Sequence, residues 1–498
     1  MKRYIAIALA AGVAASACKD NSTAAPTNAP TVDAIKNLTR TTLQQLAVGV
    51  TAQDRASFAT TGLVILPEIL ARDIYRQDAS ESRYVIETLG GQADPGSFAG
   101  GSGFSGFYTA ARAANNALIA LRNPPGGVFT AQEISVSKGF FRTLKAKEFY
   151  DVIAQRDSIG IPLQTDAPQE ITPIYCKPYV LNYIAAQLDS AYADLQAAGS
   201  TQTPFALPAS WGTTIAGRNY RLPANLIRLN RGLKGRLDFY RAMQNRAAPD
   251  ATLLNAAVAE LTLALGGQAE GAVPATDFPK GIYYQFTAAE ILNPRADAKI
   301  SANNFLRDSL TFSNVTGLHN GIDPTAPWDP TDTRLSKLIP RSDTVTLNGI
   351  TATHTLTVAQ ATAANQVLPI PMLKDEELVL LRAQANAELG AAGLAKAYLD
   401  AQSVHAAYGS NALPAFTSRD IARRYILREK RLSLLFEGPQ RLVDLRTYGY
   451  LNNSISPLTG KPYLNPELSS DPFNAAFPIP RAELNARGLQ NAPACTAS

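Results

Sequence analysis

The sequence is poor in the residues from which metal and redox centres are built. Only three histidines and three cysteines occur among 498 residues, and His319, His354 and His405 stand far apart without ligand spacing. Zinc and iron–sulfur sites need several such residues at short intervals. We therefore expect no metal and no cofactor, and we interpret the histidines as surface or helix-capping residues.

Charged residues are also scarce, at 17% of the chain, and their signs nearly cancel. The 46 lysines and arginines face 41 aspartates and glutamates, which gives a net charge of +5. Lys2 and Arg3 lie in a segment that we expect to be removed, so 44 positive side chains remain against 41 negative ones. This excess is too small to indicate a nucleic-acid surface.

Motifs of covalent chemistry are missing or lack their structural context. Gly101 to Gly106 matches G-x-G-x-x-G by letter, but no apolar strand precedes it, so we interpret it as a flexible loop. Neither a G-x-S-x-G motif nor a P-loop occurs. Glu376 and Glu377 begin a predicted helix, where negative charge suits the helix dipole. A hydrolase with two facing carboxylates stays open as an alternative.

The N-terminus has the pattern of an export signal. Lys2 and Arg3 precede an apolar stretch over 4–17 that is too short to span a bilayer comfortably. The sequence Ala-Ser-Ala directly before Cys18 resembles a bacterial lipobox, in which the cysteine carries lipid and becomes the new N-terminus. We predict a signal peptide at 1–17 and a lipidated flexible tether at 18–32. The alternative is an ordinary signal peptide that leaves Cys18 incidental.

Export would place the two other cysteines, Cys176 and Cys495, where disulfides persist. They either form one bridge that ties the C-terminal tail to the middle of the chain, or remain two unpaired thiols.

Apolar residues at helical spacing recur along most of the chain. They predict helices over 33–50, 53–78, 104–121, 130–153, 178–195, 223–243, 251–265, 374–389, 394–408 and 418–448. Small residues stand where two of these helices would cross closely: Ala383, Ala387, Gly390 and Ala397. Such pairs are typical of degenerate tetratricopeptide units, which must stack to bury both faces.

The chain is long enough for two or three joined parts, because single cores stop growing at roughly 250–300 residues. We predict helical parts at 33–267 and 372–498, separated by a loop-rich insert with short strands at 268–371. Two further loop-rich stretches, 92–103 and 201–222, interrupt the N-terminal part. Loops of this length are usually functional.

The most patterned stretch is 428–446, in which Glu437, Arg441 and Asp444 stand at spacings that let opposite charges meet on a helix. Gly438-Pro439 should bend or interrupt that helix. A catalytic cluster is one interpretation. We favour a structural ion-pair network of these three residues, because all the charges can be paired locally.

Several motifs, in order, resemble one known family. The stretch 428–446 looks like the C-terminal signature of SusD/RagB-type outer-membrane lipoproteins, and 477–493 resembles the closing proline motif of that family. The stretch 381–390 is similar to its tetratricopeptide-like helix, 140–163 to its early long helix and the following turn, and 332–334 to its short Asp-x-Arg element.

The resemblance implies a mostly α, tetratricopeptide-like scaffold that carries a loop-rich, short-strand ligand face. It implies a surface-exposed lipoprotein of the outer membrane, which binds a nutrient, foremost a glycan, and delivers it to a SusC-like TonB-dependent transporter. No enzymatic activity is implied. A peptide-binding member of the family and a helical-repeat scaffold that docks an envelope protein are the alternatives.

Sugar rings stack on exposed aromatic side chains, and a binding pocket holds few polar groups at fixed places. Aromatic residues in or beside the loops are therefore our ligand-binding candidates: Phe98, Phe104, Tyr108, Trp211, Tyr283, Tyr284 and Trp328. Among them we favour Trp211, Tyr284 and Trp328, and Asn115 and Asn116 are weaker polar candidates. The alternative for each is packing beneath a loop. With only two tryptophans in the chain, a peptide ligand stays open.

Overall fold

The computed structural model describes residues 37–59, 63–164, 170–289, 293–302, 331–340, 344–353, 356–358, 366–455, 462–464 and 466–497. The predicted signal peptide and tether, with Cys18, lie outside these residues, as do Trp328, His319 and His354. Among the helices that the structure describes, none is both long and apolar enough to cross a membrane.

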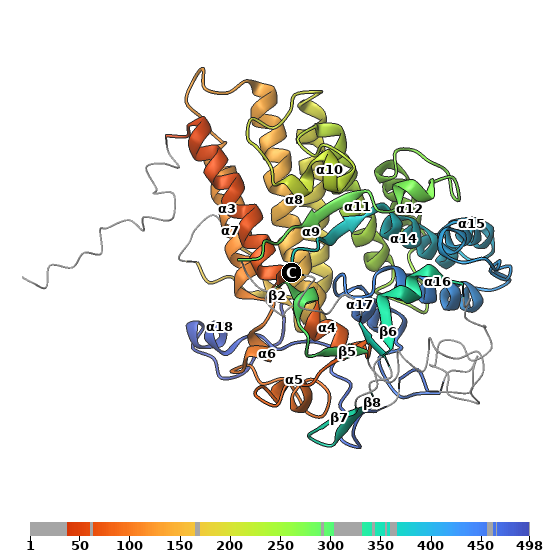
Figure 1. The fold of residues 1–498 in the computed structure, drawn as a ribbon. Helices are drawn as coiled ribbons and strands as arrows, with labels where there is room; N and C mark the ends of the chain where they lie inside the picture. The colour runs from red at the N-terminus through yellow and green to blue at the C-terminus, as the bar shows by residue number, and fades with distance from the viewer. Residues whose placement is uncertain are drawn as a thin grey trace, which may run out of the picture.

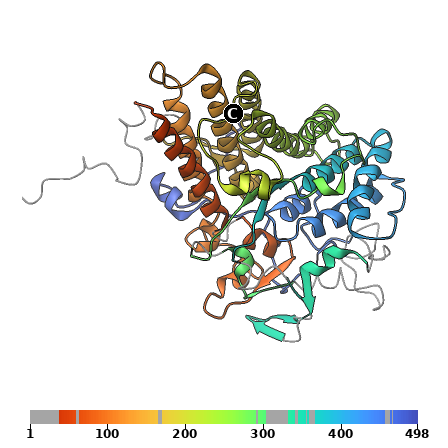
Figure 2. The ribbon, with the colours of Figure 1, turned by 45° about the horizontal axis from the view of Figure 1, so that its top comes forward.

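Long helices packed side by side form the body of the molecule, as Figure 1 shows. Figure 2 shows the same row of helices from a second direction. Each long helix packs against the next in sequence: α3 (Arg40–Ala59), α7 (Ser105–Ala120), α8 (Ala131–Arg156), α9 (Lys177–Ala197), α11 (Pro223–Ala242), α12 (Ala251–Ala264), α14 (Asp375–Glu388), α15 (Ala391–Tyr408) and α16 (Arg419–Ser433). The predicted mostly α, tetratricopeptide-like fold is confirmed.

Local sequence sets where these helices begin. At the start of α8, the Thr130 side chain accepts a hydrogen bond from the Glu133 N–H, while the Glu133 carboxylate accepts one from the Thr130 N–H. Asp250 and Ser418 cap α12 and α16. A proline lies in the first turn of α9 and of α11, where its missing N–H costs no helical hydrogen bond.

Small residues let neighbouring helices approach closely. A Cβ added to Gly139 of α8 would lie 2.5 Å from Cγ of Leu195 on α9, and α11 meets α12 at Gly235 in the same way. The alanines predicted to lie at a close crossing are buried together in one apolar cluster between α14, α15 and α16: Ala383, Ala387 and Ala397.

Two of the predicted helices are interrupted. The helix predicted over 53–78 is wrong beyond Ala59, where α3 ends; α4 (Ile65–Leu70) and β1 (Ile74–Arg76) follow. Arg72, with a φ of 61°, adopts the left-handed conformation that stops α4 and turns the chain into β1. The interruption expected at Gly438-Pro439 is confirmed, because α16 ends before it and α17 (Gln440–Tyr448) begins after it.

Pairs of short antiparallel strands accompany the helices. In the described part of 268–371, β4 (Gly281–Tyr284) pairs with β10 (Ile370–Lys374) and β7 (Thr344–Leu347) with β8 (Ile350–Thr353). The other pairs are β1 with β5 (Ile300–Ala302), β2 (Ile161–Pro162) with β3 (Ile174–Tyr175), and β6 (Leu338–Pro340) with β9 (Leu356–Val358). The remaining short helices are α5 (Arg83–Ile86), α6 (Phe98–Gly101), α10 (Thr213–Ala216) and α18 (Arg481–Ala486), with 3₁₀ turns η1 (Asp157–Ile159), η2 (Ala209–Trp211), η3 (Ala275–Asp277), η4 (Pro294–Ala296) and η5 (Thr333–Lys337).

Candidate functional site

A cavity of about 780 Å³ opens where α6, α7, the chain after β2, and α18 meet. Helices α6 and α18 are neighbours at the lower left of Figure 1. The cavity wall combines apolar side chains such as Phe104 and Pro162 with charged ones such as Arg112, Glu483 and Arg487. This volume and this mixed lining suit a small organic ligand. We call this space the α18 cavity.

An aromatic pair forms one wall of the α18 cavity. The rings of Phe104 and Tyr108 are tilted against each other with centroids 4.7 Å apart. The Tyr108 hydroxyl donates a hydrogen bond of 2.6 Å to the carbonyl oxygen of Pro162, and burial raises the pKa of this phenol well above its ordinary value. Of the predicted ligand-binding residues, Phe104 and Tyr108 line this cavity; Phe104 is buried, whereas Tyr108 is half-buried and its ring is fixed by the hydroxyl hydrogen bond.

A buried arginine fixes the loop behind that pair. Arg156, at the end of α8, donates hydrogen bonds of 2.8 Å to the carbonyl oxygens of Gly103 and Ser102 and one of 3.1 Å to that of Gly100. Its guanidinium lies 5.2 Å from the centre of the Phe104 ring. Burial lowers the pKa of Arg156 to about 9. No sequence pattern indicates this role, because Arg156 binds main-chain atoms of a loop far away in the chain.

Helix α18 forms another part of the wall. The Arg481 N–H donates to the carbonyl oxygen of Pro95 at 2.8 Å, and the Arg487 side chain donates to that of Thr172 at 2.6 Å. Arg487 is also paired with Glu483 at 2.7 Å. Beyond α18, Cys495 forms a disulfide with Cys176, with Cα atoms 4.9 Å apart. Of the two alternatives that the sequence left open, the structure has the bridge and not two unpaired thiols.

A second cavity, of about 460 Å³, lies along α3 and brings together three predicted residues, Trp211, Tyr283 and Tyr284. Two of the rings, however, are not exposed platforms, because Trp211 is 3% and Tyr284 4% exposed. Trp211 packs against Phe140 with ring centroids 5.8 Å apart. For Trp211 and Tyr284 the alternative interpretation, packing beneath a loop, is correct. Tyr283 is half-buried at the rim.

Beneath this second cavity lies a buried charged cluster. The Lys147 ammonium donates hydrogen bonds to Asp54 at 2.7 Å and Asp151 at 2.6 Å, and Glu148 lies 3.5 Å away. The Tyr284 hydroxyl donates to Asp54 at 3.0 Å. Burial, and then the charge of Asp54, raise the pKa of Glu148 well above its ordinary value. The carboxylates of Asp54, Glu148 and Asp151 are close enough to hold a cation, but the Lys147 ammonium occupies that position.

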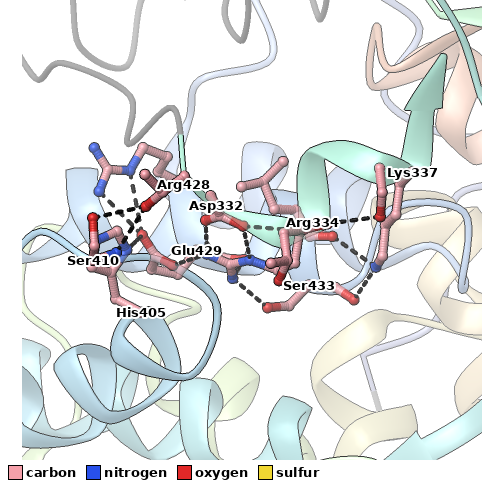
Figure 3. Close-up of polar contacts among 12 residues, drawn as sticks. Asp332, Arg334, Lys337, His405, Ser410, Arg428, Glu429 and Ser433 are labelled. Atoms are coloured by element: carbon pink, nitrogen blue, oxygen red, sulfur yellow. Dashed lines mark hydrogen bonds and ion pairs between the residues drawn. The ribbon is translucent and has the colours of Figure 1, made fainter.

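A second buried cluster, drawn in Figure 3, joins η5 to α15 and α16. Arg334 donates to both oxygens of Asp332 and also to Glu429, and His405 Nδ1 lies 3.1 Å from Glu429. Burial alone would raise the pKa of Glu429, but the charge of Arg334 lowers it to about 2. Asp332, His405 and Glu429 could group around a metal, yet here the Arg334 guanidinium supplies the positive charge. The interpretation of His405 as a surface or capping residue is wrong, since it is 3% exposed.

The predicted ion pairs among Glu437, Arg441 and Asp444 are wrong, because two of these residues pair with lysines of other elements. Glu437 is paired with Lys374 of β10 at 2.8 Å, and Asp444 with Lys430 of α16 at 2.7 Å. Because Gly438-Pro439 separates Glu437 from α17, Glu437 does not occupy the helical position that the spacing assumed. Burial lowers the pKa of Arg441 to about 10, and its guanidinium has no hydrogen-bond partner among the described residues.

The two asparagine candidates lie outside both cavities. Asn115 is buried and accepts a hydrogen bond of 2.7 Å from Lys145, which gives it a structural role.

No protein-family model matches the sequence, and no curated protein matches it either. Solved structures do match its fold. NanU of B. fragilis has a TM-score of 0.64 at 13% identity and covers 94% of this chain and 100% of its own. A SusD-like carbohydrate-binding protein from Bacteroides fragilis has a TM-score of 0.61 at 13% identity and covers 91% of this chain and 99% of its own. The surface glycan-binding protein A from Bacteroides uniformis has a TM-score of 0.61 at 14% identity and covers the same shares of the two chains, 91% and 99%.

These matches span nearly the whole of each chain at 10–16% sequence identity. The molecule has the SusD-type fold, a helical scaffold with short strands and long loops. This is the fold that the sequence motifs led us to expect.

Proposed function

We propose that this chain is a SusD/RagB-type lipoprotein that captures a glycan at the cell surface and passes it, chemically unchanged, to a TonB-dependent transporter. The SusD-type fold carries the proposal, because two solved structures with that fold bear names that state carbohydrate or glycan binding. The lipobox-like sequence before Cys18 supports attachment to the outer membrane.

We place the ligand in the α18 cavity. The half-buried Tyr108 ring gives a face for a sugar ring, and hydroxyl, guanidinium and carboxylate groups around it provide donors and acceptors for sugar hydroxyls. The half-buried Tyr108 and Arg112 are the residues we expect to touch the ligand. The second cavity offers less room for a glycan, because its volume is about 460 Å³ against about 780 Å³ for the α18 cavity.

Binding is tested with the mature chain lacking its lipid, first on a glycan array and then by calorimetry with the best ligand. We expect Tyr108→Ala to weaken binding by roughly five- to tenfold, the loss of about 1 kcal/mol of stacking. Tyr283→Ala, a half-buried tyrosine in the second cavity, is the matched control and should bind like wild type. Binding of peptides but no glycan would contradict the ligand class, and a glycan recovered in cleaved form would contradict a binding protein.

The transport role is tested separately. Affinity purification of the full-length lipoprotein from solubilised outer membranes should recover a TonB-dependent barrel protein. Recovery of the lipoprotein in a soluble, unlipidated form would contradict the proposed location.

A further inference from the structure

Two of the chain segments that line the α18 cavity are joined by the Cys176–Cys495 disulfide. Residues 170–172 line the cavity and lead through β3 directly to Cys176. Helix α18 also lines it and leads to Cys495. The bridge therefore links these two parts of the wall covalently, although its two cysteines are 319 residues apart in the sequence.

Other contacts hold α18 only weakly. The helix has six residues, and Leu484 is the one of its described side chains that is buried. A helix this short is not stable by itself in water. The Arg481 N–H to Pro95 and the Arg487 side chain to Thr172 add one hydrogen bond each to neighbouring loops.

The tail beyond α18 has few apolar anchors. Leu489 and Cys495 are half-buried against the hydrophobic core, whereas residues 490–494 and 496–497 are exposed. Thr496 exchanges two main-chain hydrogen bonds with the β3 end, from its N–H to Ile174 at 2.7 Å and from the Cys176 N–H at 2.8 Å. Hydrogen bonds at an exposed chain end exchange readily with water and contribute little net stability. The covalent bridge is thus the strongest link between this tail and the rest of the molecule.

We propose that the Cys176–Cys495 disulfide is a positioning element of the α18 cavity: it holds α18 in place as a wall, and its loss releases α18 and the tail. Upstream, the chain stays fixed by Phe477 and Ile479, which are 1% and 0% exposed. The released segment would carry away the cavity groups of Arg481, Glu483 and Arg487. The effect on the wall is independent of the ligand, whereas the effect on affinity rests on the proposed function.

Hydrogen exchange measured by mass spectrometry tests the wall. In C176S/C495S we expect the amides of residues 484–489, which form α18 and the hydrogen-bonded turn after it, to exchange at least tenfold faster than in wild type, while those of α8 keep wild-type rates. Ala494→Ser, an exposed change beside the bridge, is the matched control and should leave exchange unchanged. Equal exchange in C176S/C495S and wild type would overturn the proposal.

Folded wild-type protein treated with dithiothreitol provides a second comparison that does not depend on folding of the variant. The dithiol gives two electrons and two protons to the disulfide, which becomes two thiols while the reagent becomes a cyclic disulfide. The same tenfold faster exchange of residues 484–489 is expected, and unchanged exchange after complete reduction overturns the proposal.

Calorimetry with the glycan selected on the array tests the link to binding. C176S/C495S should bind it at least tenfold more weakly than Ala494→Ser, and equal affinity would overturn the role of the bridge in the site. If wild type binds no glycan, the proposed function fails, and the exchange measurement alone decides the role of the disulfide.

Discussion

At the scale of single residues, buried charges give the clearest predictions about stability. Glu148 is enclosed with Asp54 and Asp151 around one ammonium, that of Lys147. Three carboxylates facing one cation in a buried space cannot all be ionised at low cost, so Glu148 keeps its proton to a higher pH than an exposed glutamate.

This predicts a pH-dependent stability. A pKa raised on folding contributes stability that is fully present below the pKa of the unfolded glutamate, about 4.3, and is lost as pH rises through the folded pKa. Wild type should therefore lose more stability than Glu148→Gln between pH 5 and pH 9, measured as urea midpoints. Glu170→Gln, an exposed change, is the control. A parallel pH dependence of wild type and Glu148→Gln would contradict the assignment.

The Arg334 cluster gives a second residue-scale prediction. Arg334→Met would leave Asp332 and Glu429 buried without their cation, which costs about 3–5 kcal/mol. Arg334→Lys keeps the charge but loses the two-pronged geometry, so we expect a smaller loss. Arg83→Lys, in a more exposed pair, should change stability little. Chemical denaturation of the three variants checks this order, and equal losses in all three would refute it.

The sequence was a poor guide to which side chains pair with one another in the fold. The spacing of Glu437, Arg441 and Asp444 suggested local pairs, but two of them bind lysines of other elements. Likewise, Trp211 and Tyr284 line the second cavity but are buried, because sequence shows that a residue is aromatic and not whether its ring is exposed.

At the scale of elements, helices were predictable because apolar spacing is a local property of the chain. Their crossings rest on small residues whose neighbours are distant in sequence. Gly139 of α8 faces α9 so closely that an added Cβ would meet Cγ of Leu195 at 2.5 Å and the Ala191 carbonyl oxygen at 3.0 Å.

Two glycine-to-alanine changes should therefore have opposite signs. Gly139→Ala forces α8 and α9 apart and should destabilise the protein by about 1–3 kcal/mol. Gly49→Ala lies on the exposed side of α3 with no atom within 4 Å of the new Cβ, and should stabilise by about 0.5–1 kcal/mol. Thermal or urea unfolding of both variants measures the difference, and changes of the same sign would refute the packing argument.

At the scale of the whole molecule, the fold could be predicted from the sequence, whereas the position of the candidate site could not. The α18 cavity joins residues around 95–112, 162–164, 170–172 and 480–487, which no periodicity connects. Of the residues that line it, only Phe104 and Tyr108 were among the candidates. The wall formed by α18 depends on long-range contacts and on a disulfide whose pairing the cysteine count left undecided.

The most direct test of the account is a crystal structure of the mature chain with the glycan that it binds best. Density for an intact sugar between Tyr108 and α18 is the predicted result. Density in the second cavity, or a cleaved product in either, would contradict the account of this molecule as a carrier that holds its ligand in the α18 cavity without altering it.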